Sequence, residues 1–249
     1  MPREGKKARG GRARAVVAAL QETYPRSTCA LDHRSPFQLL VATVLSAQTT
    51  DVAVNAVTPV LFARFSEPAS MAAAPEGEIE RLIGSIGLWR QKAKSLRALS
   101  ARLVEEHGGE VPADLEALRS LPGVGKKTAT AVLGTAFGIA AGITVDTHML
   151  RVNRLLRLST ARDADRMSQE LEELVPREAW TGYTHHVIDH GRLVCVARRP
   201  RCGVCVLADR GLCPSAFSEK AGYRPTNDER EPASAKGVSW RARRDAGLA

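Results

Sequence analysis

The chain has 249 residues with a formal net charge of +9, and 44% of them are apolar, which is enough for one large or two small hydrophobic cores. No apolar run reaches the roughly 18 residues of a membrane helix, and the N-terminal apolar stretch is too short for a signal peptide, so we expect a cytoplasmic protein without a membrane partner. The basic excess is typical of nucleic-acid-binding proteins, and the prevalence of helix-forming residues predicts an all-α fold.

The first 14 residues carry six Lys and Arg side chains against Glu4, together with three glycines. This composition predicts a flexible basic arm, which either adds non-specific attraction to DNA phosphates or is simply solvated. A short helix is expected from Ala13 to about Tyr24.

A buried helix is predicted to begin at Ser35, because Ser35 and Gln38 fit a capping box and Pro36 occupies the first helical position. The polar loop SAQTTD follows it, and the next helix is expected to begin at Asp51, which as a plain loop residue would cap that helix. Pro59 falls inside that next helix and is expected to end or kink it.

Two further helices are predicted at 76–84 and 89–106, and His107-Gly108-Gly109 ends the second. Leu88 lies in the loop between them. Its surroundings in the sequence favour a core position for this leucine.

The segment LPGVGKK predicts a tight hairpin between two helices, because Gly123 and Gly125 lie one residue apart behind a proline. Amides at Gly123, Val124 and Gly125, with the next helix's N-terminus, would bind a phosphate independently of base sequence. The alternative is an ordinary corner between two helices. Lys126 and Lys127 open the second helix, where the macrodipole disfavours cations and favours the neutral amine of a nucleophile.

Asp146 precedes another amphipathic helix, for which it is a suitable N-cap. That structural role would suffice to explain the residue. A catalytic role would require its carboxylate to lie close to Lys127.

Four cysteines, Cys195, Cys202, Cys205 and Cys213, follow the spacing C-x6-C-x2-C-x7-C, which predicts a metal site. On ligand chemistry alone, four thiolates suit structural zinc and a [4Fe–4S] cluster equally. The basic side chains between the first two ligands, which either contact the DNA backbone or are solvated, are Arg198, Arg199 and Arg201.

The segments LPGVGKKTA, VDTHMLRVNR and HGRLVCVARRPRCGVC together resemble the helix-hairpin-helix DNA glycosylases, and the endonuclease III family most closely. The resemblance implies two helical domains flanking a DNA-binding cleft and a [4Fe–4S] cluster on the four cysteines, although the last gap is seven residues here and five in the family pattern. It implies a helical barrel domain over 29–140 and a cluster domain over 141–214 with which residues 1–28 pack. The polar composition of 215–249 predicts a disordered tail.

The resemblance implies a base-excision-repair glycosylase with AP lyase activity that removes oxidised pyrimidines from damaged double-stranded DNA. Lys127 would form a Schiff base assisted by Asp146, and β-elimination would cut the strand 3′ to the lesion. By the same resemblance Gln48 fills the gap left by the extruded base, Leu88 wedges into the duplex, and Lys126 contacts phosphate. We expect a monomer associated with the nucleoid.

Other functions remain open at this point. An adenine glycosylase of the same fold is disfavoured by Lys127 and by SAQTT where those enzymes carry a glutamate. A mismatch-thymine or pyrimidine-dimer glycosylase shares the same frame. A non-catalytic DNA-binding module would need no Asp–Lys pair.

Overall fold

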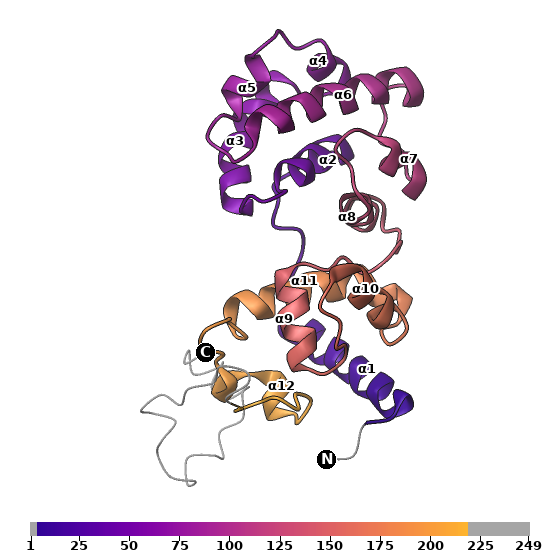
Figure 1. The fold of residues 1–249 in the computed structure, drawn as a ribbon, viewed down its shortest axis with the longest axis vertical. Coiled ribbons are helices and arrows are strands. Elements are labelled where there is room, and N and C mark those ends of the chain that lie inside the picture. The colour runs from indigo at the N-terminus through magenta and orange to yellow at the C-terminus, as the bar shows by residue number, and fades with distance from the viewer. Residues whose placement is uncertain (1–3, 219–249) are drawn as a thin grey trace. The chain divides into compact units, whose positions relative to one another are not determined.

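The computed structural model describes residues 4–218, and every regular element among them is helical, which confirms the all-α prediction (Figure 1). The chain divides into two compact units. One is Cys29–Ala141, and the other combines Met1–Thr28 with Gly142–Ala249. Each unit has a hydrophobic core of its own. Within the described residues, no helix is both long enough and apolar enough to cross a bilayer.

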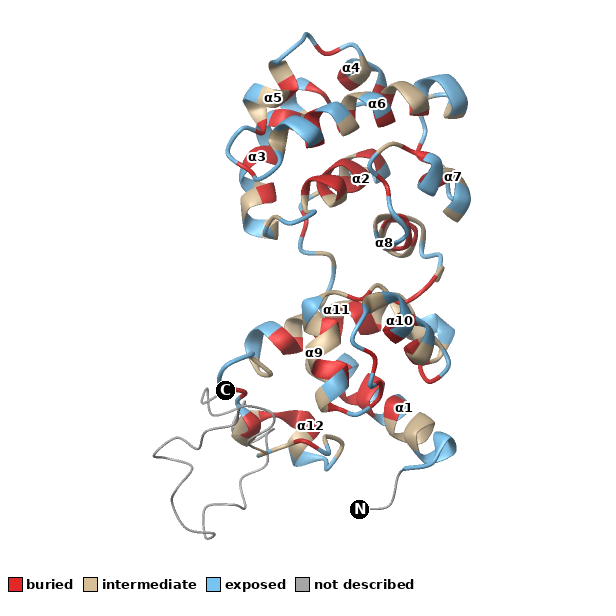
Figure 2. Cartoon of the chain, in the orientation of Figure 1, coloured by how far each residue is buried: buried red, intermediate tan, exposed pale blue. Residues whose placement is uncertain are grey.

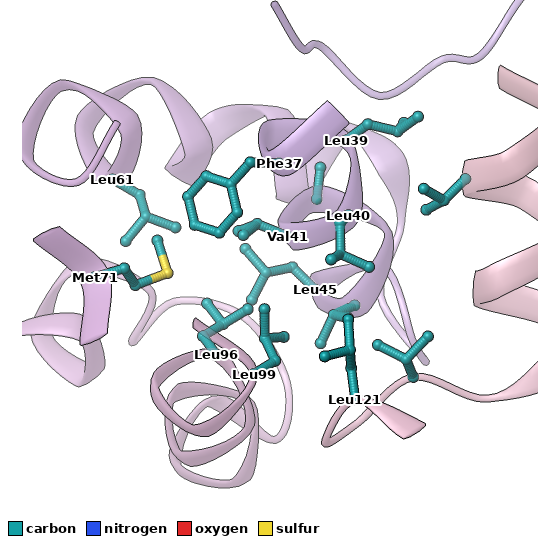
Figure 3. Packing of buried hydrophobic residues seen from close by; sticks show 14 of the residues in the cluster. Phe37, Leu39, Leu40, Val41, Leu45, Leu61, Met71, Leu96, Leu99 and Leu121 are labelled. Atoms are coloured by element: carbon teal, nitrogen blue, oxygen red, sulfur yellow. The ribbon is translucent and has the colours of Figure 1, made fainter. Parts of the chain in front are cut away.

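The unit Cys29–Ala141 is built around α2, which is apolar on nearly all sides and buries seven of its ten residues (Figure 2). Figure 3 shows Leu45 of α2 pointing toward Leu96 and Leu99 of α6. The helices of this unit are α2 (Pro36–Leu45), α3 (Asp51–Arg64), α4 (Pro68–Ala72), α5 (Glu78–Leu82), α6 (Trp89–His107), α7 (Leu115–Ser120) and α8 (Lys126–Phe137).

The start of α2 is as predicted, since Ser35 Oγ accepts a hydrogen bond from the Gln38 amide at 3.2 Å. The Gln38 side chain instead accepts from the amide of Arg34, so the reciprocal half of the capping box is displaced by one residue. The cap predicted for α3 is wrong. Thr50 caps it through the Ala53 amide, and Asp51 is the first helical residue.

The helix does not end at Pro59, because α3 continues through the proline to Arg64, and the kink expected as the other outcome stays a prediction. Pro59 lies on the exposed side of the helix. The Asn55 carbonyl that loses its donor there can bond to water instead, while the opposite face, including Val57 and Leu61, stays packed in the core.

The other unit packs α1 against α11 and α12, and α11 against α9. Buried Tyr183 of α11 donates its hydroxyl to Asn153 of α9 at 2.5 Å. The elements of this unit are α1 (Lys6–Thr23), α9 (Thr147–Leu155), α10 (Ala164–Glu172), the 3₁₀ turn Arg177–Ala179, α11 (Trp180–Leu193), the 3₁₀ turn Cys202–Val204 and α12 (Val206–Asp209).

The first 14 residues were predicted to form a flexible basic arm. This prediction is wrong for the described part of that segment, because α1 begins at Lys6. Burial of Ala13, Val16 and Leu20 fixes this helix despite its paired glycines, since packing outweighs intrinsic propensity. At the other end of the chain, residues 215–218 form a turn closed by a bond from the Ser218 amide to the Ser215 carbonyl. Residues 219–249 of the expected tail lie outside the described residues.

Candidate active site and cluster loop

The hairpin between α7 and α8 requires glycine at position 123 for two reasons. Gly123 has φ of +80°, and a Cβ there would lie 2.9 Å from Cβ of Ser95 on α6. The Val124 amide closes the turn on the Leu121 carbonyl at 3.1 Å, and the Val124 side chain is buried. The DNA contact predicted for Val124 therefore cannot use its side chain or its amide, because both are engaged inside this unit.

Gly125 has no such internal requirement, since its φ is −85° and a Cβ there would meet no atom within 4 Å. It is the N-cap of α8 and provides no side-chain cap, so the amides of Lys126 and Lys127 keep no acceptor among residues 4–218. Exposed amides next to open space at a helix N-terminus suit an incoming phosphate.

A matched pair of substitutions separates these two glycines. Gly123→Ala is expected to lower the free energy of unfolding by about 2 kcal/mol or more, through backbone strain and the Ser95 contact. Gly125→Ala is expected to cost less than about 1 kcal/mol as a weaker N-cap, while weakening duplex binding about tenfold because its methyl group occupies the phosphate's space. Denaturant melts and binding titrations check both, and equal loss of stability would contradict this assignment.

Lys127 is the second residue of α8 and is exposed, as is Lys126 before it. In the part of the chain that the structure describes, neither ammonium has a hydrogen-bond or ion-pair partner. Adjacent helical residues point about 100° apart, so the two side chains serve different neighbours.

Asp146 caps α9, as its position in the sequence predicted, with Oδ1 accepting from the Met149 amide at 2.8 Å. Oδ2 has no hydrogen-bond or ion-pair partner among residues 4–218, although the carboxylate interacts electrostatically with His148, and the side chain is half-buried. One carboxylate oxygen thus stays available for chemistry. Asp146 and Lys127 belong to different units, so their pairing remains a prediction.

The four predicted metal ligands, Cys195, Cys202, Cys205 and Cys213, line one small cavity, and none of them forms a disulfide among the described residues. Burial raises the pKa of Cys195 to about 11 and that of Cys205 to about 12, so their thiolates need nearby positive charge. Between residues 4 and 218, no group of three ligating side chains converges on a single ion. Four thiols around one cavity provide one thiolate for each iron of a [4Fe–4S] cluster, and the same set of donors also suits a zinc ion.

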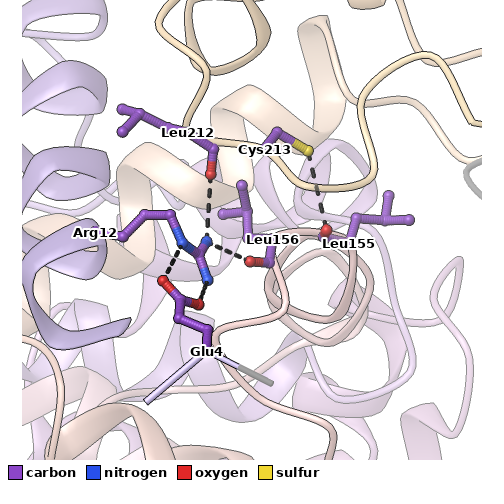
Figure 4. Close-up of polar contacts among 6 residues, drawn as sticks. All are labelled: Glu4, Arg12, Leu155, Leu156, Leu212 and Cys213. Atoms are coloured by element: carbon purple, nitrogen blue, oxygen red, sulfur yellow. Dashed lines mark hydrogen bonds and ion pairs between the residues drawn. The ribbon is translucent and has the colours of Figure 1, made fainter. Parts of the chain in front are cut away.

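Two arginines that the sequence did not single out hold the ends of this cysteine segment. Arg151 of α9 donates from Nη2 to the carbonyls of Gly191 at 2.8 Å and Cys195 at 2.9 Å. Arg12 of α1 donates from Nη1 to the Leu156 carbonyl at 2.5 Å and to the Leu212 carbonyl, next to Cys213, at 3.3 Å (Figure 4).

Comparisons with known proteins agree with this geometry. The model of the HhH-GPD superfamily of base excision DNA repair proteins matches residues 41–177, more than half of the chain, and that of the iron–sulfur binding domain of endonuclease III matches residues 195–210. Endonuclease III of Synechocystis sp. is 49% identical over 205 residues, which are 82% of this chain and 93% of that protein. The chain belongs to the endonuclease III family.

Solved structures support the same placement. A non-covalent endonuclease III–DNA complex is 41% identical, with a TM-score of 0.76, and the match covers 83% of this chain and 96% of that one. A thermostable thymine-DNA glycosylase matches with a TM-score of 0.73 at 26% identity, over 84% and 98% of the two chains. The fold is thus shared by glycosylases of different specificity, and the higher identity lies with endonuclease III.

Family membership confirms the [4Fe–4S] assignment over structural zinc. The matched iron–sulfur segment ends at residue 210, before Cys213, which lies beyond the longer last gap. Gly211, with φ of +65°, and the short helix α12 take up that length, so Cys213 still lines the common cavity. Cys213 as the fourth ligand stays a prediction, and its place in the cavity supports it.

We predict that Arg12→Met loosens the loop before Cys213. The change leaves the Leu156 and Leu212 carbonyls without their donor, a loss of roughly 1–3 kcal/mol. The cluster's visible absorbance should disappear about tenfold faster in the presence of an iron chelator. Arg14→Met removes an exposed charge from the same helix and should leave that rate unchanged. Equal rates in the two variants would contradict the role of Arg12.

The remaining predicted DNA contacts are exposed. Arg198, Arg199 and Arg201 lie on the surface between the first two ligands, and no ion pair engages them within residues 4–218. Leu88 is 58% exposed, so the core position favoured from sequence is wrong. Leu88 has φ of 58° and exposed Gln48 has φ of 54°, both in the left-handed region that non-glycine residues rarely adopt.

Proposed function

We propose that Lys127 and Asp146 perform the DNA glycosylase and AP lyase reactions by which this endonuclease III family member removes oxidised pyrimidines. The observation that carries the proposal is the exposed Lys127 in the first turn of α8, next to the open amides of the hairpin. A phosphate held on those amides would place the neighbouring sugar within reach of the Lys127 side chain.

The chemistry begins with a nucleotide extruded from the duplex, because a stacked base cannot be reached. The Lys127 amine bonds to C1′ as the bond from C1′ to the base breaks, and the base leaves with its electron pair and takes up a proton. Asp146, through Oδ2, stabilises positive charge on the sugar and accepts the proton that the attacking amine loses. The sugar ring then opens to an iminium between Nζ and C1′.

Strand cleavage follows from that iminium, which acidifies the C2′ protons. Loss of one C2′ proton and breakage of the bond from C3′ to its phosphate oxygen give β-elimination. The products are a 5′-phosphate and an unsaturated sugar still bound to Lys127. Hydrolysis of the iminium by water returns the free amine.

The other predicted residues bind and shape the DNA. Amides at Gly123 and Gly125, with the Lys126 ammonium, hold a backbone phosphate. Arg198, Arg199 and Arg201 contact the backbone from the loop that the thiolate-bound cluster holds in place. Gln48 fills the gap left by the extruded base, and Leu88 separates the neighbouring base step.

The substrate is damaged double-stranded DNA, and one copy of the chain carries the full set of residues in this proposal. We therefore propose a monomeric enzyme in the cytoplasm, associated with the nucleoid. Sedimentation with and without a duplex tests the stoichiometry, and a second protein copy bound per lesion would contradict it.

A nicking assay on otherwise identical duplexes tests the proposed substrate class. Thymine glycol should be released and the strand cut 3′ to it, whereas a cyclobutane dimer and a G·T mismatch should stay intact. Preferential cleavage of the dimer or mismatch would show that the enzyme has that specificity instead. Base release without strand cleavage would show that the enzyme is a glycosylase without lyase activity.

A further inference from the structure

Lys92 is a buried lysine that the proposed chemistry does not use. It lies in the first turn of α6 and is 5% exposed, and Nζ donates to Thr49 Oγ1 at 2.6 Å. Within residues 4–218, no carboxylate lies within ion-pair distance of it. Burial lowers its pKa, and a buried ammonium with only a hydroxyl partner is costly. Packing alone therefore gives no reason for a lysine at this position.

The contacts of Lys92 connect the loops of the two proposed gap-filling residues. Its backbone amide donates to the Leu88 carbonyl at 3.0 Å, while its side chain reaches Thr49, the residue after Gln48. The loops are also adjacent, since a Cβ on Gly87 would lie 3.9 Å from the Gln48 carbonyl. Lys92 thus joins the loop before α6 to the loop after α2.

Both loops hold a strained residue at their tip. Gln48 and Leu88 have φ values of 54° and 58°, and their side chains are exposed. A left-handed non-glycine residue costs about 1 kcal/mol or more and persists only where its surroundings fix it. The Lys92–Thr49 hydrogen bond is one restraint that fixes the Gln48 tip relative to the Leu88 tip.

The same helix supports the hairpin, because Ser95 lies about one turn beyond Lys92 and packs under Gly123. The face of α6 that carries Lys92 and Ser95 therefore contacts three separate DNA-facing loops of this unit. Helices hold such positions more precisely than loops do by themselves.

We propose that Lys92 is a positioning residue that holds the Gln48 loop against the Leu88 loop, so that both side chains enter the duplex as one unit at a lesion. The inference rests on the DNA-filling roles in the proposed function. This arrangement does not strengthen binding to intact DNA, because only an extruded base leaves a gap for Gln48. The consequence is selective binding of damaged over intact duplex.

The test measures selectivity rather than activity. The dissociation constants of the full chain are determined for a duplex with a tetrahydrofuran abasic analogue and for the same duplex intact. Lys92→Met and Thr49→Val remove the two ends of the hydrogen bond while preserving side-chain volume. Each should reduce the ratio of the two constants about tenfold, and the double variant should lose no more than either one. Lys94→Met removes an exposed charge from the same helix and should leave the ratio unchanged.

A second readout separates positioning from general stability. A 2-aminopurine next to the lesion should show less unstacking with Lys92→Met or Thr49→Val than with wild type, at saturating protein and with an intact thermal transition. Should Lys92→Met fail to fold, Thr49→Val decides alone. An unchanged selectivity ratio in a folded variant, or additive losses in the double variant, overturns the inference. A wild-type protein without any preference for the lesion overturns the proposed DNA-filling roles as well.

Discussion

Lys127→Gln is expected to lower the rate of strand cleavage at thymine glycol by at least about 10³-fold, because glutamine has no amine to attack C1′. Binding to the same duplex should weaken only slightly. The free energy of unfolding should change by less than about 1 kcal/mol, since Lys127 is exposed and its charge lies at the unfavourable end of α8. Single-turnover cleavage and denaturant melts measure the two effects.

Lys126→Gln is the matched control, because it removes the same charge one position earlier in α8. Its single-turnover rate should stay near the wild-type value. Its affinity should fall similarly for damaged and intact duplexes, and the slope of log affinity against log salt should decrease by about one. Loss of cleavage in Lys126→Gln with cleavage retained in Lys127→Gln would exchange the two roles.

Asp146→Asn is expected to reduce base release by about 10²–10³-fold while preserving α9, because the asparagine amide oxygen can still accept from the Met149 amide. The carboxylate's negative charge is lost, and with it the stabilisation of the positive sugar and the proton acceptor. Single-turnover release of thymine glycol measures the reaction, and thermal melting measures the helix cap.

Two further variants separate the capping role from the catalytic role. Asp146→Ala should lose the same activity and about 1 kcal/mol of stability in addition, since it removes the cap. Asp163 caps α10 in the same way, with its carboxylate accepting from the Arg166 amide, so Asp163→Asn should change neither activity nor stability appreciably. Activity loss in proportion to stability loss across the three variants would show that Asp146 acts only as a cap.

Local signals in the sequence predicted the parts of the structure that depend on neighbouring residues. Ser35 with Pro36 predicted the start of α2, and Asp146 predicted the cap of α9. The closely spaced Gly123 and Gly125 predicted the hairpin. Each follows from backbone chemistry over a few residues. The spacing of the cysteines is also a local signal, and it predicted a metal site. Only the family comparison decides which metal the site holds.

Features that depend on distant contacts were missed or misjudged. Residues 6–12 look like a flexible arm until the core that buries the rest of α1 is known, and only then does Arg12 find the Leu156 and Leu212 carbonyls. Lys92 reads as a surface residue of a charged helix, although it reaches a loop 43 residues earlier. Leu88 reads as a core residue, because no local pattern reveals the left-handed turn that exposes it.

Borohydride trapping followed by peptide mapping tests the central claim most directly. The wild-type protein is incubated with thymine glycol duplex and reduced during turnover, and the protein–DNA adduct is digested and sequenced by mass spectrometry. The proposed reaction predicts a reduced sugar attached to Nζ of Lys127, and no adduct in Lys127→Gln. An adduct on Lys126 or elsewhere, or base release without any adduct, would contradict the assignment of Lys127 as the nucleophile.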